Sequence, residues 1–335
     1  MLSTHKVEVV QVFPRTHPNA DKLEVCDVFG GYPCVVGKWQ FSDGELAAYL
    51  PPDSVVDLTR PEFAFLAKGT KTKHRVKCVK LRGVASFGLL MPAPDGSQVG
   101  DDVAAYYGVE HYEPPMKNAC TGGENACTGG EAESAPGLLS QLSKYDIDSL
   151  RRYVGVFEVG EPVFLSEKLH GASARYSWMD GRLWVGSRSE WKRYDEHNLW
   201  WKVAECTPSI KAFCEAHPGF VLFGECYGQV QDLTYGTKKG EVRFAAFDVL
   251  TDRGAFLNAW DGRKLCEEFG VPCVPFICEM PFDFDAVCQL SDGPSLIEGA
   301  NHCREGCVVK PLVERFHQAV GRAQLKVVGS QYLSR

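Results

Sequence analysis

The chain has 335 residues, of which 44% are hydrophobic and 24% charged, and it carries a net charge of −7. This is the composition of an ordinary globular protein, and it excludes a collagen-like or wholly disordered chain. The length suits two domains that each bury their own core. The acidic balance argues against broad, non-specific coating of nucleic acid, although it leaves room for a local basic track.

No segment has the pattern of a signal peptide or a membrane span. The amino-terminal residues lack a long apolar core, and no apolar run approaches the length of a bilayer crossing. The 14 cysteines are scattered without any Cys-x-x-Cys pair, which gives little support to a zinc ribbon or a thioredoxin-type site. Reduced, mostly buried thiols are the expectation, and we therefore expect a cytoplasmic protein.

The first third of the chain predicts a small β-barrel. Apolar and polar residues alternate, between separating glycines and prolines, over residues 6–13, 23–29, 32–37, 45–50 and 75–81. The turn-rich segment His17-Pro18-Asn19-Ala20-Asp21-Lys22-Leu23 resembles the opening of OB-fold modules attached to tRNA-binding proteins. We therefore predict an OB-like, nucleic-acid-binding barrel over residues 1–113.

Residues 68–82 form a basic stretch, with seven Lys or Arg and no acid. One interpretation is a groove that follows a nucleic-acid backbone, because neutralised phosphates supply most sequence-independent affinity. The other is a solvated edge strand protected by its lysines. We favour RNA contact because of the domain that follows, and we assign it to Lys71, Lys73, Arg75 and Lys77.

A low-complexity stretch covers residues 114–138. The hexapeptide Ala-Cys-Thr-Gly-Gly-Glu at residues 119–124 recurs at residues 126–131. A repeat this short, rich in Gly and poor in bulky apolar residues, cannot bury a core. We therefore predict a flexible Gly-rich linker between two domains.

Residues 139–335 have the pattern of an α+β domain. Short apolar stretches predict strands over residues 163–167, 172–178, 182–186, 221–225, 243–250 and 306–310. Helical spacing, which in the first case comes from Leu139, Leu142, Ile147 and Leu150, predicts helices over residues 140–153, 199–205, 209–216, 260–269 and 284–290. The alternation suggests antiparallel sheets with flanking helices that line a pocket.

Five short motifs follow one another in this domain. They are Glu167-Lys168-Leu169-His170-Gly171, Phe223-Gly224-Glu225, Phe244-Ala245-Ala246-Phe247-Asp248, Glu305-Gly306-Cys307-Val308-Val309-Lys310-Pro311 and Leu325-Lys326-Val327-Val328. A Lys-x-His-Gly sequence alone is a weak signal. As an ordered set the five resemble the nucleotidyltransferase motifs of ATP-dependent polynucleotide ligases, and the Glu-Lys-x-His-Gly form is similar to that of the RNA ligase 2 clade.

The domain order is similar to that of one group in this clade. In DNA ligases and capping enzymes an OB domain follows the last motif, whereas here that motif lies close to Arg335 and the OB-like segment comes first. This order resembles the Deinococcus and Naegleria type of RNA ligase over nearly the full length of the chain. The expected fold is therefore an OB-like barrel followed by a ligase-type adenylyltransferase domain over residues 139–335.

The resemblance implies a three-step reaction. Lys168 attacks the α-phosphate of ATP to give lysyl-AMP, AMP passes to a 5′-phosphate on RNA, and a 3′-hydroxyl then displaces AMP. The expected cofactors are ATP and Mg²⁺ or Mn²⁺, with Glu225 and Glu305 as carboxylates for the metal and the ribose. The expected substrate is RNA with 3′-hydroxyl and 5′-phosphate ends, such as a nicked duplex, sealed by a monomer in RNA repair.

The resemblance also implies how the nucleotide is held. Glu167 corresponds to the residue that reads the adenine amino group, and Phe247 to the aromatic residue that stacks on the base. His170 agrees with the RNA ligase 2 pattern, and we expect it, as a neutral imidazole, to contact the phosphate region or a metal-bound water. Leu169 lies within the same motif, and Gly171 lets the backbone approach the nucleotide closely.

Three basic residues complete the expected site. Arg188 stands where the family places an arginine near the ribose and the incoming RNA end, and the forked donors of Arg suit phosphate. Lys310 and Lys326 end apolar runs, where a buried charge needs a partner such as phosphate oxygens, and as cations they would favour an unprotonated nucleophile nearby. The last motif of the family carries two lysines separated by one residue, and here Gln324 stands in place of the first.

Two other functions fit parts of this pattern. One is an mRNA-capping-type guanylyltransferase, which shares the lysine chemistry, but the His-Gly form of the first motif and the position of the OB-like segment count against it. The other is a non-catalytic OB-fold protein that binds RNA or tRNA beside a degenerate transferase domain. The intact Lys, Glu and Phe positions of the motifs count against that alternative.

Overall fold

The computed structural model describes residues 5–67, 69–112, 129–142 and 144–335. The first copy of the hexapeptide repeat and most of the expected linker lie outside these residues. The chain divides into two compact units. The first unit comprises Met1–Glu113, Leu150–Val154 and Ser330–Arg335, and the second comprises Pro114–Ser149 and Gly155–Gly329. The division into domains at residues 113 and 138 remains a proposal.

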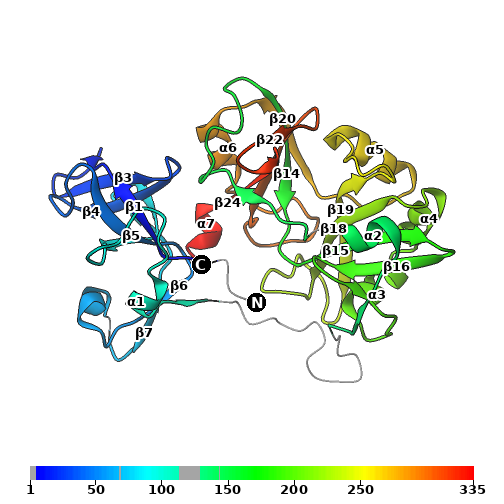
Figure 1. Ribbon diagram of the computed structural model, residues 1–335, viewed down its shortest axis with the longest axis horizontal. Coiled ribbons are helices and arrows are strands. Elements are labelled where there is room, and N and C mark those ends of the chain that lie inside the picture. Colours follow the sequence, from blue (N-terminus) through cyan, green and yellow to red (C-terminus); the bar gives the residue numbers. More distant parts are fainter. Residues whose placement is uncertain (1–4, 68, 113–128, 143) are drawn as a thin grey trace. The chain divides into compact units, whose positions relative to one another are not determined.

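The first unit is built mainly from short antiparallel strands (Figure 1). Its elements are β1 (Glu8–Val12), β2 (Arg15–Thr16), β3 (Leu23–Val28), β4 (Tyr32–Gly37), β5 (Glu45–Leu50), β6 (Ser54–Asp57), the 3-10 helix η1 (Pro61–Leu66), β7 (Lys73–Arg75), β8 (Cys78–Leu81), β9 (Val84–Phe87), β10 (Leu89–Pro92), α1 (Ala104–Tyr107), β11 (Glu110–His111) and α7 (Ser330–Leu333). Hydrogen bonds group the strands into three sheets, ordered β1-β5-β10, β2-β3-β4 and β11-β6-β7, and a β8–β9 hairpin.

Two of the strands predicted for this unit have the predicted bounds, and one is interrupted. The predictions for residues 32–37 and 45–50 are confirmed by β4 and β5. The strand predicted over residues 75–81 is split into β7 and β8. The split occurs because the chain changes partner: the Val76 amide donates to the Ser54 carbonyl at 2.7 Å, whereas Cys78 pairs with Phe87.

The helix predicted over residues 140–153 is wrong. The structure has a short helix α2 (Gly137–Gln141) and a two-residue strand β13 (Asp148–Ser149) there. The regular apolar spacing does not mark one helix face, because Leu139 packs with Trp191 in the second unit whereas Leu150 is fully buried in a segment of the first unit.

The residues after Leu150 are held inside the first unit by two arginines. The Arg151 guanidinium stacks on Phe87 at 4.3 Å and donates to the Gly31 carbonyl at 3.2 Å. Arg152 pairs with Glu8 at 2.9 Å. These contacts explain why a stretch remote in sequence from residues 1–113 completes this unit.

The second unit is made of two larger sheets and a two-stranded one, with helices beside both larger sheets (Figure 1). Besides α2 and β13, its elements are β12 (Ala132–Glu133), β14 (Pro162–Lys168), β15 (Ala172–Met179), β16 (Arg182–Ser187), β17 (Trp191–Lys192), α3 (Leu199–Cys206), α4 (Pro208–Ala216), β18 (Val221–Gly228), β19 (Val242–Leu250), α5 (Ala259–Glu268), β20 (Phe276–Pro281), α6 (Phe284–Leu290), β21 (Gly306–Pro311), β22 (Phe316–His317), β23 (Gly321–Arg322) and β24 (Leu325–Val328). The larger sheets run β12-β17-β16-β15-β18-β19 and β13-β24-β21-β14-β20.

The six-stranded sheet is buried on both faces. On one face α3, α4 and α5 supply Val203, Phe213 and Cys266 to a core that includes Tyr176 of β15. On the other face Trp191 and its neighbours form a second apolar cluster. Successive side chains of a strand point to opposite faces of its sheet, so β15, β16, β18 and β19 supply residues to both clusters. The expected α+β class with antiparallel sheets is confirmed.

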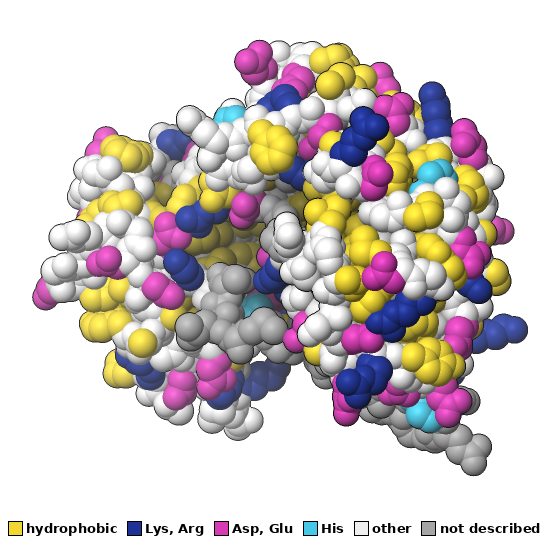
Figure 2. Space-filling view, turned by 45° about the vertical axis from the view of Figure 1, so that its right-hand side comes forward, with side chains coloured by type: hydrophobic (Ala, Val, Ile, Leu, Met, Phe, Trp, Pro, Cys, Tyr) yellow, Lys and Arg dark blue, Asp and Glu magenta, His cyan; other side chains and the backbone are white. Residues whose placement is uncertain are grey.

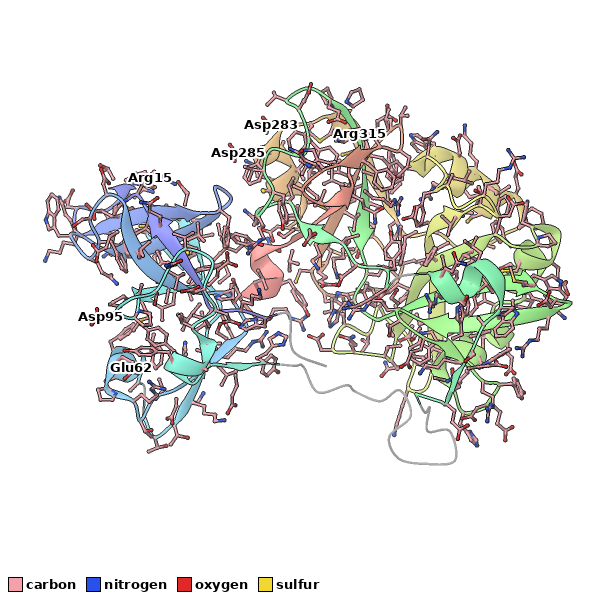
Figure 3. All side chains as sticks on the ribbon, in the orientation of Figure 1. Arg15, Glu62, Asp95, Asp283, Asp285 and Arg315 are labelled. Atoms are coloured by element: carbon pink, nitrogen blue, oxygen red, sulfur yellow. The ribbon has the colours of Figure 1, made fainter. Side chains whose placement is uncertain are left out.

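Local side chains fix where helices and strands of this unit begin. Asp283 accepts a hydrogen bond from the Ala286 amide at 2.7 Å and so caps α6. Arg315 donates to Glu161 at 2.8 Å and holds the start of β14 (Figure 3). The predicted helix over residues 284–290 is confirmed with these bounds. None of the helices in the described part of the chain is long and apolar enough to cross a membrane.

Candidate active site

Lys168 and Glu305 meet because two neighbouring strands bring them together. Lys168 ends β14 and is paired in register with Gly306 of β21, so Glu305 lies directly beside it. The Lys168 Nζ is 2.6 Å from the Glu305 Oε1. The Lys168 side chain is 23% exposed and that of Glu305 only 9%. The buried Glu305 carboxylate therefore fixes the position of Lys168, the candidate nucleophile, whose side chain is partly exposed.

His170 extends this contact into a charged network. Its Nε2 lies 2.8 Å from the Asp232 Oδ1, and its Nδ1 lies 3.4 Å from the Glu305 Oε2. Burial opposes protonation, but Asp232 and Glu305 raise the pKa of His170 to about 9. Burial likewise opposes ionisation of Glu305, yet Lys168 and His170 hold its pKa to about 2. At neutral pH His170 is thus protonated and not the neutral imidazole that we expected, because Asp232 and Glu305 stabilise its charge. The network is an alternating set of cations and carboxylates.

The loop after β18 holds the first motif in place. Its Tyr235 is fully buried and accepts a hydrogen bond from the His170 amide at 2.7 Å. Tyr235 has a φ of 52°, which is unusual for an aromatic residue, and its amide donates to the His302 ring at 3.1 Å. Asp232 comes from the same loop. Sequence reasoning missed Asp232, Tyr235 and His302 because loops carry no apolar periodicity.

The two candidate metal carboxylates lie close enough to influence each other. Burial raises the pKa of Glu225 to about 7, and the charge of Glu305 adds to the effect while Lys168 and His170 oppose it. The Oε2 of Glu305 is buried and contacts the His170 Nδ1 at 3.4 Å. A divalent cation would stabilise the ionised form of both carboxylates, so the pair fits Mg²⁺ or Mn²⁺.

The protein alone would not complete such a metal site. The part of the chain that the structure describes holds no group of three or more His, Cys, Asp or Glu placed to bind a metal ion. Mg²⁺ is commonly held by one or two carboxylates, with waters and substrate phosphates in the remaining positions. Glu225 and Glu305 are consistent with that kind of site.

Glu167 is oriented by the loop between α6 and β21. It is 1% exposed, and its two carboxylate oxygens accept hydrogen bonds of 2.6 Å from the Ser295 hydroxyl and the Leu296 amide. Burial raises the pKa of Glu167, while these two hydrogen bonds oppose the shift. Leu169, two residues on, is buried at 4% exposure. Both carboxylate oxygens of Glu167 therefore already accept hydrogen bonds from the protein, which fix the orientation of the side chain.

Phe247 and Lys310 lie beside a buried carboxylate. The Lys310 Nζ donates to the Phe247 carbonyl at 2.6 Å and pairs with Asp248 at 3.0 Å. Arg322 contacts the other Asp248 oxygen at 2.8 Å. The half-buried ring of Phe247 packs against Tyr145, with centroids 5.1 Å apart. Lys310 is thus engaged by Asp248 in this structure.

The last motif contributes one lysine near the nucleophile and one amide elsewhere. Burial, and after it the charge of Lys168, lower the pKa of Lys326. Gln324, which stands where the family has a second lysine, is buried and donates to the Tyr145 hydroxyl. Arg188 lies in the exposed turn after β16, 3.9 Å from Asp146.

In the first unit the four expected RNA-binding residues line one hollow: Lys71, Lys73, Arg75 and Lys77. Two of them already have partners, because Lys73 pairs with Glu110 at 2.6 Å and Arg75 with Asp53 at 2.7 Å. Over the face shown in Figure 2, Lys and Arg side chains are interspersed with Asp and Glu. The structure gathers these four residues but leaves their role a prediction.

Two protein families match the chain. The RNA ligase family model matches residues 161–328, and a model described as an OB-fold domain matches residues 2–93. The expectation of an OB-fold domain ahead of the ligase-type domain is therefore confirmed. No curated protein shows a significant match to the sequence.

Solved structures of a Naegleria gruberi RNA ligase share the fold. A mutant bound to ATP and Mn is 24% identical and covers 97% of each chain, with a TM-score of 0.74. A second mutant with ATP and Mn is 24% identical over 98% of each chain, with a TM-score of 0.75. The enzyme with PPi is 25% identical over 98% of each chain, with a TM-score of 0.74.

Proposed function

The chain belongs to the RNA ligase family, and we propose that it is an ATP-dependent member that works through lysyl-AMP on Lys168. The observation that carries the proposal is the 2.6 Å contact between Lys168 and Glu305, residues 137 positions apart, inside a network with His170. Glu225 contributes a further carboxylate nearby. Structures of similar fold with ATP, Mn or PPi support the choice of nucleotide.

In the first step the Lys168 nitrogen forms a bond to the α-phosphorus of ATP as the bond to the pyrophosphate oxygen breaks. The amine attacks after its proton has passed to water, and Glu305 aims its nitrogen by a direct hydrogen bond. The protonated His170 adds positive charge beside the reacting phosphate. A divalent cation bound by Glu225 and Glu305 would neutralise phosphate charge.

In the second step AMP passes to the 5′-phosphate of an RNA end, and in the third a 3′-hydroxyl displaces AMP and seals the strand. We propose that the substrate is a nicked duplex, that the hollow lined by Lys71, Lys73, Arg75 and Lys77 contacts its backbone, and that the role is RNA repair. We propose a cytoplasmic monomer, since cysteines scattered through the sequence without a Cys-x-x-Cys pair fit a reducing compartment.

The proposal is tested by labelling the protein with α-³²P ATP in Mg²⁺ or Mn²⁺ and separating it on a denaturing gel. Wild type is expected to become labelled, and Lys168→Ala to lose the label completely, because the nucleophile is gone. Lys264→Ala, on the exposed side of α5, removes a lysine elsewhere and is expected to label normally. Label from GTP alone would favour a guanylyltransferase, and no label from either nucleotide would refute lysyl-AMP chemistry.

A sealing assay then tests the substrate. Labelled protein is offered nicked duplex RNA and, separately, single-stranded RNA with the same ends. We expect faster sealing of the nick. Equal or faster joining of single strands would contradict the proposal of a duplex substrate while leaving the ligase activity intact.

A further inference from the structure

Arg175 is a buried arginine that forms no ion pair with any residue the structure describes. It lies in the middle of β15 and is 2% exposed. Its Nε and Nη1 have no hydrogen-bond partner within the described ranges. The guanidinium stacks on Trp191 at 4.5 Å. The Glu190 carboxylate, whose charge favours the cation, is bonded instead to Lys192 at 2.8 Å.

Such an arrangement is unfavourable unless a ligand completes it. A buried charge loses its hydration, and native proteins normally restore the loss with an ion partner and hydrogen bonds. Burial lowers the pKa of Arg175 to about 10, against the opposing charge of Glu190, so the guanidinium remains charged at neutral pH. The unpaired Nε and Nη1 donors of Arg175 therefore favour the binding of an anion.

Two serine hydroxyls lie in the same row as Arg175, along one face of β15. Ser173, Arg175 and Ser177 alternate along β15 and so face the same side of the sheet. The hydroxyls of both serines are buried and lack a hydrogen-bond partner among the described residues. In the neighbouring strand β18, Ser173 is paired with Glu225. The row of unused polar groups thus begins beside one of the candidate site carboxylates.

The same row passes beside the turn that carries Arg188. Gly186 is paired with Arg175, and a Cβ atom added at Gly186 would lie 3.1 Å from the Arg175 Cγ and 2.9 Å from the Glu190 carbonyl. Strand β16 ends one residue later, at Ser187, so the Arg175 side chain lies next to the Ser187–Glu190 turn.

We propose that Arg175, with the hydroxyl of Ser173, binds a phosphate group of the RNA strand. The inference rests on the proposed function, which makes RNA the substrate and Arg188 a contact to its end. A guanidinium offers forked donors and no acceptor, which matches phosphate oxygens. For the phosphate to reach Nε and Nη1, the Trp191 ring that covers the guanidinium has to shift.

The test compares Arg175→Met with Arg182→Met. Arg182 is the matched control because it also stacks on a tryptophan, Trp184 at 3.7 Å, but its side chain is 49% exposed and paired with Glu133. Binding of a fluorescent nicked RNA duplex, with a 5′-phosphate or a 5′-hydroxyl at the nick, is measured by anisotropy at one fixed salt concentration without ATP. Lysyl-AMP formation is measured in parallel.

We expect Arg175→Met to weaken binding of the 5′-phosphate duplex at least about tenfold, equivalent to about 1.4 kcal/mol, with lysyl-AMP formation unchanged. Loss of affinity for the 5′-phosphate duplex alone identifies the terminal phosphate, and equal loss for both duplexes identifies a phosphate within the strand. Arg182→Met is expected to match wild type within about twofold, as surface charges contribute little.

Unchanged RNA binding by Arg175→Met would overturn the proposal, as would loss of lysyl-AMP formation with intact RNA binding, which would assign Arg175 to ATP. Without RNA, Arg175→Met is expected to unfold at a higher temperature than wild type, because an unpaired buried charge is replaced by an apolar side chain. Failure of wild type itself to form lysyl-AMP would refute the proposed function, while the binding comparison would still decide the role of Arg175.

Discussion

Asp248 balances the charges beside the candidate nucleotide site. Its two oxygens contact Lys310 and Arg322, and the Tyr145 hydroxyl also bonds to it. All of these groups are largely removed from water. A buried ion is favourable only while its partners are present. Burial opposes ionisation of Asp248, but Lys310 and Arg322 lower its pKa to about 2.

Replacing Asp248 with Asn is expected to lower the free energy of unfolding by about 3 to 5 kcal/mol, because two buried cations lose their counter-charge. The loss is measured by denaturant unfolding. Asp95→Asn, at an exposed position of the first unit (Figure 3), is the control and is expected to match wild type.

The same residue predicts a pH dependence. Because the pKa of Asp248 falls from 3.8 in the unfolded chain to about 2, its ionisation stabilises the folded protein fully above pH 3.8. That contribution, about 2 kcal/mol, is lost as the pH falls toward 2. The stability difference between wild type and Asp248→Asn should therefore shrink over this interval. A difference that stays constant from pH 4 to pH 2 would contradict the assignment.

At the scale of elements, the start of β15 depends on a close approach to β18. A Cβ atom added at Gly171 would lie 2.0 Å from the Cys226 carbonyl oxygen, which no ordinary contact permits. The sequence suggested that Gly171 admits the nucleotide, and the structure supplies a second reason for glycine, which is the adjacent strand. The backbone that follows His170 cannot move away without disturbing this pairing.

Gly171→Ala is expected to reduce lysyl-AMP formation roughly a hundredfold, because a displacement of about 1 Å at reacting groups has an effect of that size. The measurement is the rate of labelling with α-³²P ATP. Gly262→Ala in α5, where an added Cβ meets its neighbours at 3.7 Å or more, is the matched control. Normal labelling of Gly171→Ala would show that the strand adjusts without moving Lys168.

The elements that the sequence predicted well are those with one uniform environment. Strand β4 and helix α6 each keep one apolar face against one core, so periodicity gives their bounds. The segment around Leu139 and Leu150 failed because its apolar residues serve different cores. Asp232 and the orphan donors of Arg175 depend on contacts between strands and loops remote in sequence, which one sequence does not display.

At the scale of the whole molecule, the first unit is completed by remote parts of the chain. Gly31 shows how tightly the segment Leu150–Val154 is fitted, since an added Cβ there would lie 2.2 Å from the Arg151 carbonyl oxygen. Gly31→Ala is expected to destabilise the first unit by about 1 to 3 kcal/mol through overpacking. Hydrogen exchange should rise in β3 and β4 and remain unchanged in β14 and β21.

Gly155→Ala is the control for that substitution, because no atom lies within 4 Å of an added Cβ at that position. It is expected to leave exchange in both units unchanged. Faster exchange throughout the chain in Gly31→Ala would show that the two units unfold together.

The inclusion of Ser330–Arg335 in the first unit has a consequence for protein synthesis. A nascent chain that has reached residue 329 already holds every residue of the second unit, whereas the unit that begins at Met1 still lacks helix α7. The part translated first is therefore finished last. A stop codon at position 330 would release a chain with a whole catalytic unit but an incomplete OB-fold unit.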